Sequence, residues 1–190
     1  MREVQGIVLT GGQSRRMGKD KSTLDFGGKK FTEHIIDVLK NVTNDIIIVG
    51  PKAEYKNFSG HFFEDIFKDK GPASGILTGL TESKHELNLI LSCDVPLIKS
   101  SLLTGLMQAY NGEDALICGM DDQLHPLVGI YRKTCAKTIH KCIEKNNLKL
   151  TSIFDELNVG SYNVPRIWQE QLMNINLPMQ YEKLKNDYSN

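Results

Sequence analysis

A glycine-rich, basic segment near the N-terminus carries the strongest chemical signal in the sequence. Residues 9–21 have the sequence LTGGQSRRMGKDK, in which two adjacent glycines precede four cationic side chains. Glycines let backbone N–H groups wrap closely around a polyanion, and Arg and Lys side chains bind phosphate oxygens. The segment therefore predicts a local phosphate site that stabilises a transferring phosphoryl group. The alternative is a solvated connection with surface lysines.

Two common phosphate-binding motifs do not fit this segment. A Walker A loop would be GxxxxGK[ST], but the interval from Gly12 to Gly18 is longer and Lys19 is followed by Asp20. The dinucleotide fingerprint GxGxxG is also absent. Neither of these two motifs therefore accounts for the predicted phosphate site.

Asp94 is the second candidate for chemistry. It stands in the sequence CDVP, directly after the apolar residues 88–92. A single carboxylate at the end of a central strand can hold Mg²⁺, because this ion completes its octahedron with water and phosphate oxygens. Such an ion would stabilise charge on a leaving pyrophosphate. The alternative is an aspartate that only caps a turn or a helix.

The elements that must position these residues alternate along the chain. Apolar segments predict strands at residues 4–10, 46–49, 61–63, 88–92, 115–118, 127–131 and 173–176. Helical spacing predicts helices at 32–42, from 72, from 100, 133–145, 149–157 and from 178. We expect one α/β domain over residues 1–190, with a doubly wound, mostly parallel sheet in a three-layer α/β/α arrangement and a frayed tail at 185–190. Ligands of such sheets bind at the carboxyl ends of the strands, here after Thr10, Val49, Phe63 and Ser92.

The composition narrows the choice of partners and compartment. The 190-residue chain contains 23 Lys plus Arg and 23 Asp plus Glu, so its formal net charge is zero. Nucleic-acid and membrane-surface binders usually carry a basic excess, so neither partner is expected. No apolar run is long enough to span a membrane, and the four cysteines show no CxxC spacing. We expect a cytoplasmic protein with free thiols.

The basic segment resembles the signature L-[AT]-G-G-x-S-x-R-M-G-x-D-K of the molybdenum cofactor guanylyltransferases (MobA type). These enzymes belong to the nucleotidyltransferase class with a Rossmann-like fold, of the nucleotide-diphospho-sugar transferase type. The resemblance implies that the backbone holding guanine and phosphates is that of Leu9, Thr10, Gly11 and Gly12. It also implies that Arg15 and Lys21 bind the triphosphate and that Asp94 is the metal ligand.

Three further segments resemble the same family. Asp65 stands before GPASGI as in the family's D-x5-G-P-L-x-G segment, which implies a contact with the guanine nucleotide; Asp69 is a rival with a poorer spacing, and a turn-capping role is the alternative. The sequence HPLVGIY, beginning at His125, resembles the family's stretch near the acceptor pocket, where a histidine could orient an acceptor phosphate or a pterin edge; a packed loop histidine is the alternative. Residues 173–180 resemble the family's ending but depart from it at Leu177, Met179 and Gln180, which leaves the cap of the last helix open.

The resemblance implies an Mg²⁺-dependent transfer of GMP from GTP to the terminal phosphate of Mo-molybdopterin, with Arg15, Lys21 and Asp94 as catalytic residues. The products are pyrophosphate and molybdopterin guanine dinucleotide, which would be handed to molybdoenzymes or their chaperones. Two alternatives within the fold are a molybdopterin cytidylyltransferase and a sugar-phosphate nucleotidyltransferase, which usually begin with LAAG rather than LxGG. A GTP-binding regulatory module without catalysis is a third alternative.

Overall fold

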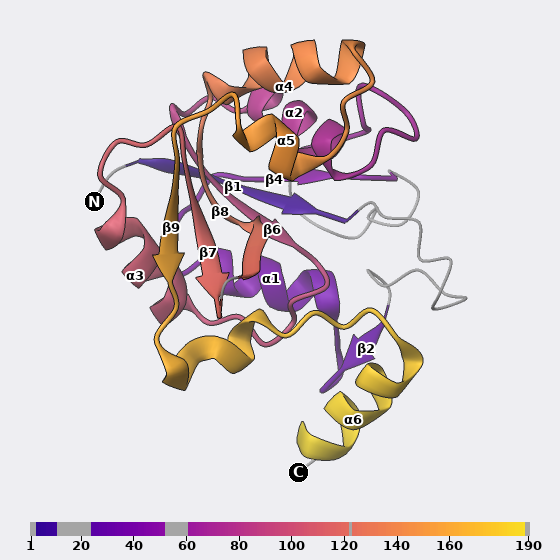
Figure 1. Ribbon diagram of the computed structural model, residues 1–190. Coiled ribbons are helices and arrows are strands. Elements are labelled where there is room, and N and C mark those ends of the chain that lie inside the picture. Colours follow the sequence, from indigo (N-terminus) through magenta and orange to yellow (C-terminus); the bar gives the residue numbers. More distant parts are fainter. Residues whose placement is uncertain (1–2, 11–23, 52–60, 122, 189–190) are drawn as a thin grey trace.

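A computed structural model describes residues 3–10, 24–51, 61–121 and 123–188 of the chain. In this part, a twisted sheet lies between two layers of helices (Figure 1). The strands are β1 (Val4–Leu9), β2 (Asp25–Phe26), β3 (Lys29–Lys30), β4 (Ile46–Val49), β5 (His61–Phe63), β6 (Leu87–Ser92), β7 (Ala115–Met120), β8 (Gln123–Arg132) and β9 (Val159–Asn163). The helices are α1 (Phe31–Leu39), α2 (Pro72–Glu82), α3 (Ser100–Ala109), α4 (Cys135–Glu144), α5 (Leu150–Phe154), the 3₁₀ helix η3 (Arg166–Leu172) and α6 (Pro178–Tyr188).

The main sheet has the strand order β5-β4-β1-β6-β8-β7-β9 in the described part of the chain. Strands β5, β4, β1 and β6 pair in parallel, and so do β7 and β9. Strand β8 runs antiparallel to both of its neighbours, β6 and β7. Only two residues separate β7 from β8, and so short a connection can join only antiparallel strands. The predicted mostly parallel sheet is confirmed.

Apolar side chains cover both faces of the sheet. Helices α1 and α3 pack on one face through Ile35, Leu39 and Leu103, and helices α2, α4 and α5 pack on the other through residues such as Ile76 and Ile139. Strands that are buried on both faces need apolar residues at successive positions, as in Ile47, Ile48 and Val49, rather than strict alternation. The three-layer arrangement predicted from these runs is confirmed.

The C-terminal third of the chain differs from the sequence-based expectation. The strand expected at residues 173–176 is absent from the sheet, so this prediction was wrong; a strand instead occurs at β9, which had not been predicted. The sequence of β9, VGSYN, contains too few apolar residues to be recognised as a strand. The segment 173–176 has one fully buried apolar residue, Ile175, which packs in a small cluster with Leu24, Phe31 and Leu184. Helix α6 extends to Tyr188, further than the polar tail had suggested.

Candidate active site

The predicted site residues that the structure describes gather at one edge of the sheet. Parallel strands β1, β5 and β6 end at this edge with Leu9, Phe63 and Ser92. Because β8 is reversed, it begins at the same edge with Gln123. Thr10, Asp65, Asp94 and His125 all lie within three residues of these strand ends. The predicted residues Gly11, Gly12, Arg15 and Lys21 lie outside the described part of the chain.

Leu9 and Thr10 are fixed by hydrogen bonds to both neighbouring strands. The backbone N–H of Thr10 donates to the Val49 carbonyl at 2.9 Å, and its side-chain hydroxyl donates to the same oxygen at 3.0 Å. On the other side, the Cys93 N–H donates to the Leu9 carbonyl at 3.0 Å. The Thr10 hydroxyl is therefore already paired within the protein. The family resemblance implies that its contact with a nucleotide comes from its backbone.

Asp65 follows β5 and has a carboxylate oxygen that is buried but unpaired. Its Oδ1 has no hydrogen-bond partner among the described residues. Burial raises the pKa of the Asp65 carboxyl above its usual value, and a hydrogen bond from the Ser74 hydroxyl partly opposes this rise. A Cβ built on Gly75 would lie 3.6 Å from Asp65 Oδ1 and 3.4 Å from a Leu9 methyl carbon. Asp65 thus lies next to Leu9, over the first turns of α2.

The loop that carries Asp65 is held by side chains of α2. The Ile66 N–H donates to Thr78 Oγ1 at 3.0 Å, and the Phe67 N–H donates to Ser74 Oγ at 3.1 Å. Asp69, the rival for the same role, is exposed and has a positive φ of 60°. The structure therefore gives Asp65, and not Asp69, a fixed and half-buried position beside the predicted nucleotide backbone.

Asp94 follows β6 with its backbone held and its carboxylate available. The Asp94 carbonyl accepts a hydrogen bond of 2.8 Å from the Ile175 N–H. Its half-buried side chain makes no hydrogen bond or ion pair with another described residue. Among the described residues, no group of three or more acidic, His or Cys side chains could hold a metal by itself. One free carboxylate fits Mg²⁺ that takes its other ligands from phosphate and water, since this ion rarely has a complete set of protein ligands.

His125 lies near Asp94, although the two residues come from different parts of the sequence. The ring of His125 is half-buried, and its Nε2 atom is buried without a hydrogen-bond partner among the described residues. Burial lowers the pKa of the His125 imidazole, and the negative charge of Asp94 acts in the opposite direction. The sequence alone had given His125 only a family resemblance. Its proximity to Asp94 depends on the pairing of β8 with β6, which no local sequence pattern reveals.

The residues that support Asp94 continue into α6, whose first turn is capped by Gln180. The Gln180 Oε1 accepts hydrogen bonds from the Asn176 N–H at 2.7 Å and from the Leu177 N–H at 2.9 Å. The Tyr181 hydroxyl donates to the Asp25 carbonyl at 2.6 Å and so joins α6 to the β2–β3 hairpin. The cap that the sequence had left open is thus supplied by Gln180 itself.

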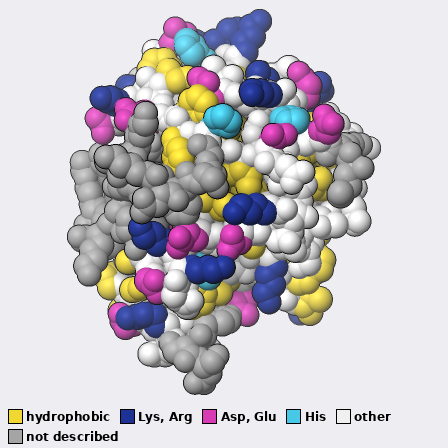
Figure 2. All heavy atoms as spheres, turned by 180° about the vertical axis from the view of Figure 1, so that it is seen from behind, with side chains coloured by type: hydrophobic (Ala, Val, Ile, Leu, Met, Phe, Trp, Pro, Cys, Tyr) yellow, Lys and Arg dark blue, Asp and Glu magenta, His cyan; other side chains and the backbone are white. Residues whose placement is uncertain are grey.

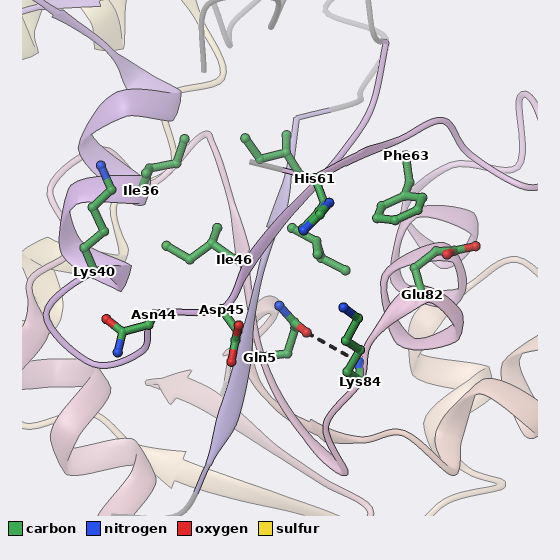
Figure 3. A pocket seen from close by; sticks show the side chains of 12 residues that line it. Gln5, Ile36, Lys40, Asn44, Asp45, Ile46, His61, Phe63, Glu82 and Lys84 are labelled. Carbon is green, nitrogen blue, oxygen red and sulfur yellow. Dashed lines mark hydrogen bonds between the residues drawn. The ribbon is translucent and has the colours of Figure 1, made fainter. Parts of the chain in front are cut away.

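A separate pocket of about 480 Å³ lies at the opposite edge of the sheet (Figure 3). Its walls include Gln5, Ile46 and His61, which stand at or near the amino ends of β1, β4 and β5. The Lys84 N–H donates to Gln5 Oε1 at 3.4 Å across this pocket. None of the predicted site residues that the structure describes lines it, and it lies at the other end of the strands from Thr10, Asp65 and Asp94.

Charges on the surface are mixed rather than segregated. Figure 2 shows Lys and Arg side chains beside Asp and Glu side chains over the described part of the back face. In the described ranges, no helix has both the length and the apolar composition needed to cross a membrane.

Comparison with known proteins identifies relatives along nearly the whole chain. A family model described as a MobA-like NTP transferase domain matches residues 6–159. A protein of Flavobacterium johnsoniae is 34% identical over 177 residues, which is 93% of both chains, and a protein of a Geobacillus species is 31% identical over 97% of this chain and 99% of its own. Both carry the name "probable molybdenum cofactor guanylyltransferase".

Solved structures share the same architecture. The molybdopterin-guanine dinucleotide biosynthesis protein A of Archaeoglobus fulgidus superposes with a TM-score of 0.84 at 24% identity, over 98% of this chain and 99% of that one. A methylerythritol-phosphate cytidylyltransferase of Thermus thermophilus superposes with a TM-score of 0.72 at 11% identity, over 99% of this chain and 100% of that one. These likenesses show the nucleotidyltransferase fold.

Proposed function

The chain belongs to the MobA-like NTP transferase family, and we propose that it transfers GMP from GTP to the terminal phosphate of Mo-molybdopterin. The names of its relatives support this activity. The structural observation that carries the proposal is the arrangement of Asp65, Leu9 and Asp94 along one edge of the sheet. This arrangement suits a nucleotide that lies across the strand ends with its base near Asp65 and its phosphates near Asp94.

The proposed reaction is a single displacement at the α-phosphorus of GTP. An oxygen of the acceptor's terminal phosphate forms the new P–O bond, while the bond to the β-phosphate breaks and pyrophosphate leaves. The acceptor phosphate is already an anion, so no covalent enzyme intermediate is needed. Catalysis then consists mainly of alignment and of charge neutralisation around the transferring group.

Asp65 is the proposed guanine-binding residue. A carboxylate can accept hydrogen bonds from both N–H groups on the Watson–Crick edge of guanine. The buried Oδ1, which has no partner in the described part of the chain, supports this role, because buried polar atoms in folded proteins usually have a partner. The adjacent Leu9 would contact the apolar face of the base, since its side chain lies beside the same glycine of α2.

Asp94 is the proposed ligand of Mg²⁺. When bound, this ion would stabilise the charge that develops on pyrophosphate. The hydrogen bond between the Asp94 carbonyl and the Ile175 N–H holds its backbone, and its carboxylate has no hydrogen-bond partner among the described residues. Arg15 and Lys21 follow Thr10 within the basic segment, and we assign them to the triphosphate on the family resemblance. Gly11 and Gly12 would let the backbone between these groups approach the phosphates.

We also propose a cytoplasmic location and hand-over of the product to molybdoenzymes or their chaperones. The four cysteines are buried free thiols, which suits a reducing compartment. Burial raises the pKa of Cys118 and of Cys135 to about 12, so neither thiol is activated for disulfide exchange.

The test is pyrophosphate release from purified protein with Mo-molybdopterin and each of the four nucleoside triphosphates, with and without Mg²⁺. We expect release with GTP and Mg²⁺ only. Preferred use of CTP would identify a cytidylyltransferase, and use of a sugar phosphate in place of molybdopterin would identify a sugar-phosphate enzyme. Tight GTP binding without turnover would contradict the proposed activity and indicate a regulatory module.

A further inference from the structure

Two buried hydroxyl groups stand on α2, beside the loop that carries Asp65. Ser74 and Thr78 are four residues apart and so lie on the same side of the helix, and each is only 1% exposed. Their neighbours on the helix, Ile76 and Leu77, are apolar core residues. A buried hydroxyl in such surroundings is costly unless it is hydrogen-bonded, so the partners of these two groups indicate their role.

Both hydroxyls accept hydrogen bonds from the backbone that directly follows Asp65. Thr78 Oγ1 accepts from the Ile66 N–H at 3.0 Å, and Ser74 Oγ accepts from the Phe67 N–H at 3.1 Å. The Thr78 hydroxyl donates its own hydrogen to the Ser74 carbonyl at 2.8 Å, which fixes the direction of its oxygen. The loop between β5 and α2 contains no helix or strand, so these side chains take over the task of holding its backbone. We call the two hydroxyls and the two N–H groups the hydroxyl clamp.

The hydroxyl clamp holds the peptide unit from which the Asp65 side chain extends. The Ile66 N–H belongs to the same peptide unit as the Asp65 Cα atom, and a peptide unit is planar and rigid. The bond from Ile66 to Thr78 therefore also fixes the Cα atom of Asp65. A Cβ built on Gly75 would lie 3.6 Å from Asp65 Oδ1, so the carboxylate lies against the same stretch of α2 as the clamp.

Recognition of a base by one carboxylate depends on such a fixed backbone. Asp65 Oδ1 is buried and has no hydrogen-bond partner among the described residues. Hydrogen bonds weaken steeply when donor and acceptor are poorly aligned. A loop that must first be ordered by the ligand loses part of the binding free energy, whereas a loop that is already ordered does not.

We propose that Thr78, together with Ser74, is a positioning residue for guanine recognition, which holds the peptide after Asp65 so that the carboxylate meets the Watson–Crick edge of the base. This inference rests on the proposed function. Neither hydroxyl touches the nucleotide, and both act through the backbone of the loop and the Asp65 carboxylate.

The first test is Thr78→Val, which replaces the hydroxyl with a methyl group of similar size and leaves the Ile66 N–H without its acceptor. Calorimetry gives the affinities for GTP and for inorganic tripolyphosphate, which has the phosphates but no base, both with Mg²⁺. We expect the affinity for GTP to fall about twofold to tenfold, the worth of one neutral hydrogen bond, and the affinity for tripolyphosphate to stay unchanged. Thr78→Ser keeps the hydroxyl and should bind GTP as wild type does.

A matched control comes from α3. The Thr104 hydroxyl donates to the Ser100 carbonyl at 2.9 Å, the same bond to the carbonyl four residues earlier, on the opposite face of the sheet from Asp65. Thr104→Val should therefore leave the affinity for GTP unchanged.

The second test combines Thr78→Val with Asp65→Asn in a double-mutant cycle. If Thr78 acts through the carboxylate, its substitution should have little further effect on GTP affinity once the carboxylate is gone. A general structural role of Thr78 would instead lower the affinity by the same factor in both backgrounds, and this result would contradict the inference. If Thr78→Val does not fold, Ser74→Ala takes its place in the cycle, with the same expectations.

Other results would also overturn the inference. These are an unchanged affinity of Thr78→Val for GTP, an equal loss of its affinity for tripolyphosphate, or a Thr78→Ser variant as weak as Thr78→Val. If Asp65→Asn alone binds GTP as wild type does, the guanine contact of the proposed function fails as well. If Asp65→Asn weakens the binding of GTP and Thr78→Val does not, only the role of the hydroxyl clamp is refuted.

Discussion

The backbone N–H of Ile175 donates a hydrogen bond of 2.8 Å to the carbonyl of Asp94. Ile175 is fully buried in the cluster that also contains Leu24, Phe31 and Leu184. The loop with the candidate metal ligand is thus tied to the C-terminal segment and, through that cluster, to the beginning of α1. A residue without any chemistry of its own therefore takes part in positioning the carboxylate.

This relationship makes Asp94→Asn a clean test of the carboxylate. The substitution keeps the shape of the side chain and the carbonyl that accepts from Ile175, so the melting temperature should stay near that of wild type. Turnover should fall by about a hundredfold or more, because the loss of metal binding removes several kcal/mol of charge stabilisation.

Lys21→Ala should reduce turnover similarly by removing a triphosphate contact. Pyrophosphate-release kinetics measure both, and near-normal turnover in either variant would remove that residue from the mechanism.

Asp65→Asn should raise the thermal stability of the protein at neutral pH while it weakens the binding of GTP. Burial raises the pKa of Asp65 in the folded protein above its unfolded value, so the folded state holds a proton more tightly. The stability linked to this group is therefore fully present at acid pH, below the unfolded pKa, and is lost as the pH rises through the folded pKa. At neutral pH, Asp65→Asn removes a buried charge and should raise the melting temperature, and this gain should vanish at acid pH.

The same variant should lose selectivity for guanine. An amide replaces one of the two carboxylate oxygens with an NH2 group that only donates, so its two terminal atoms cannot both accept from the N–H groups of the base. Calorimetry should show weaker GTP binding, while Asp69→Asn, which changes an exposed carboxylate on the same loop, should bind GTP as wild type does. Equal effects of the two substitutions would argue against a specific role of Asp65.

Gln180→Ala should destabilise the protein through the cap of α6. Two backbone N–H groups, those of Asn176 and Leu177, lose their common acceptor. The loss of a helix cap typically costs about 1 kcal/mol in unfolding free energy, which urea denaturation can measure. Gln180→Glu keeps an acceptor at the amino end of the helix, where negative charge is favourable, and should be at least as stable as wild type. A stable Gln180→Ala would show that solvent replaces the cap.

Gly79→Ala tests the contact between α2 and β1. A Cβ at this position would lie 2.6 Å from the Ile7 Cγ2 atom, which is too close unless the Ile7 side chain, the sheet or the helix shifts. Overpacking of this kind typically costs about 1–3 kcal/mol. Gly75→Ala is the matched control on the same helix, because its nearest neighbour would be a Leu9 methyl carbon at 3.4 Å. Equal unfolding free energies of the two variants would contradict the close packing.

The sequence predicted the parts of the fold that depend on local patterns. Continuous apolar runs identified β1, β4 and β6, and the position of Asp94 directly after such a run was enough to place it at the binding edge. The strand β9 was missed because VGSYN contains few apolar residues; in the structure it pairs with β7 at the edge of the sheet. Residues 173–176 were assigned to a strand because apolar and polar residues alternate there, as in a half-buried strand. In the structure, Ile175 is a single buried residue of a loop.

The site was predicted less completely than the fold. Asp65 and Asp94 follow recognisable strands, so their places could be inferred before the structure was known. The proximity of His125 to Asp94 could not be inferred, because it depends on the insertion of β8 between β6 and β7. Sequence order gives no such information, since β7 precedes β8 along the chain but lies beyond it in the sheet.

Because β8 runs in the reverse direction, the connection between β7 and β8 can change in length independently of the parallel strands of the sheet. Strand β7 ends and β8 begins at the binding edge, whereas the strands that end at Leu9, Phe63 and Ser92 belong to the parallel part of the sheet, β5-β4-β1-β6. Residues can be inserted into that connection without altering the register of those strands. Lengthening this hairpin is accordingly the simplest route by which a common GTP-binding scaffold could be adapted to accept larger or differently shaped phosphate esters.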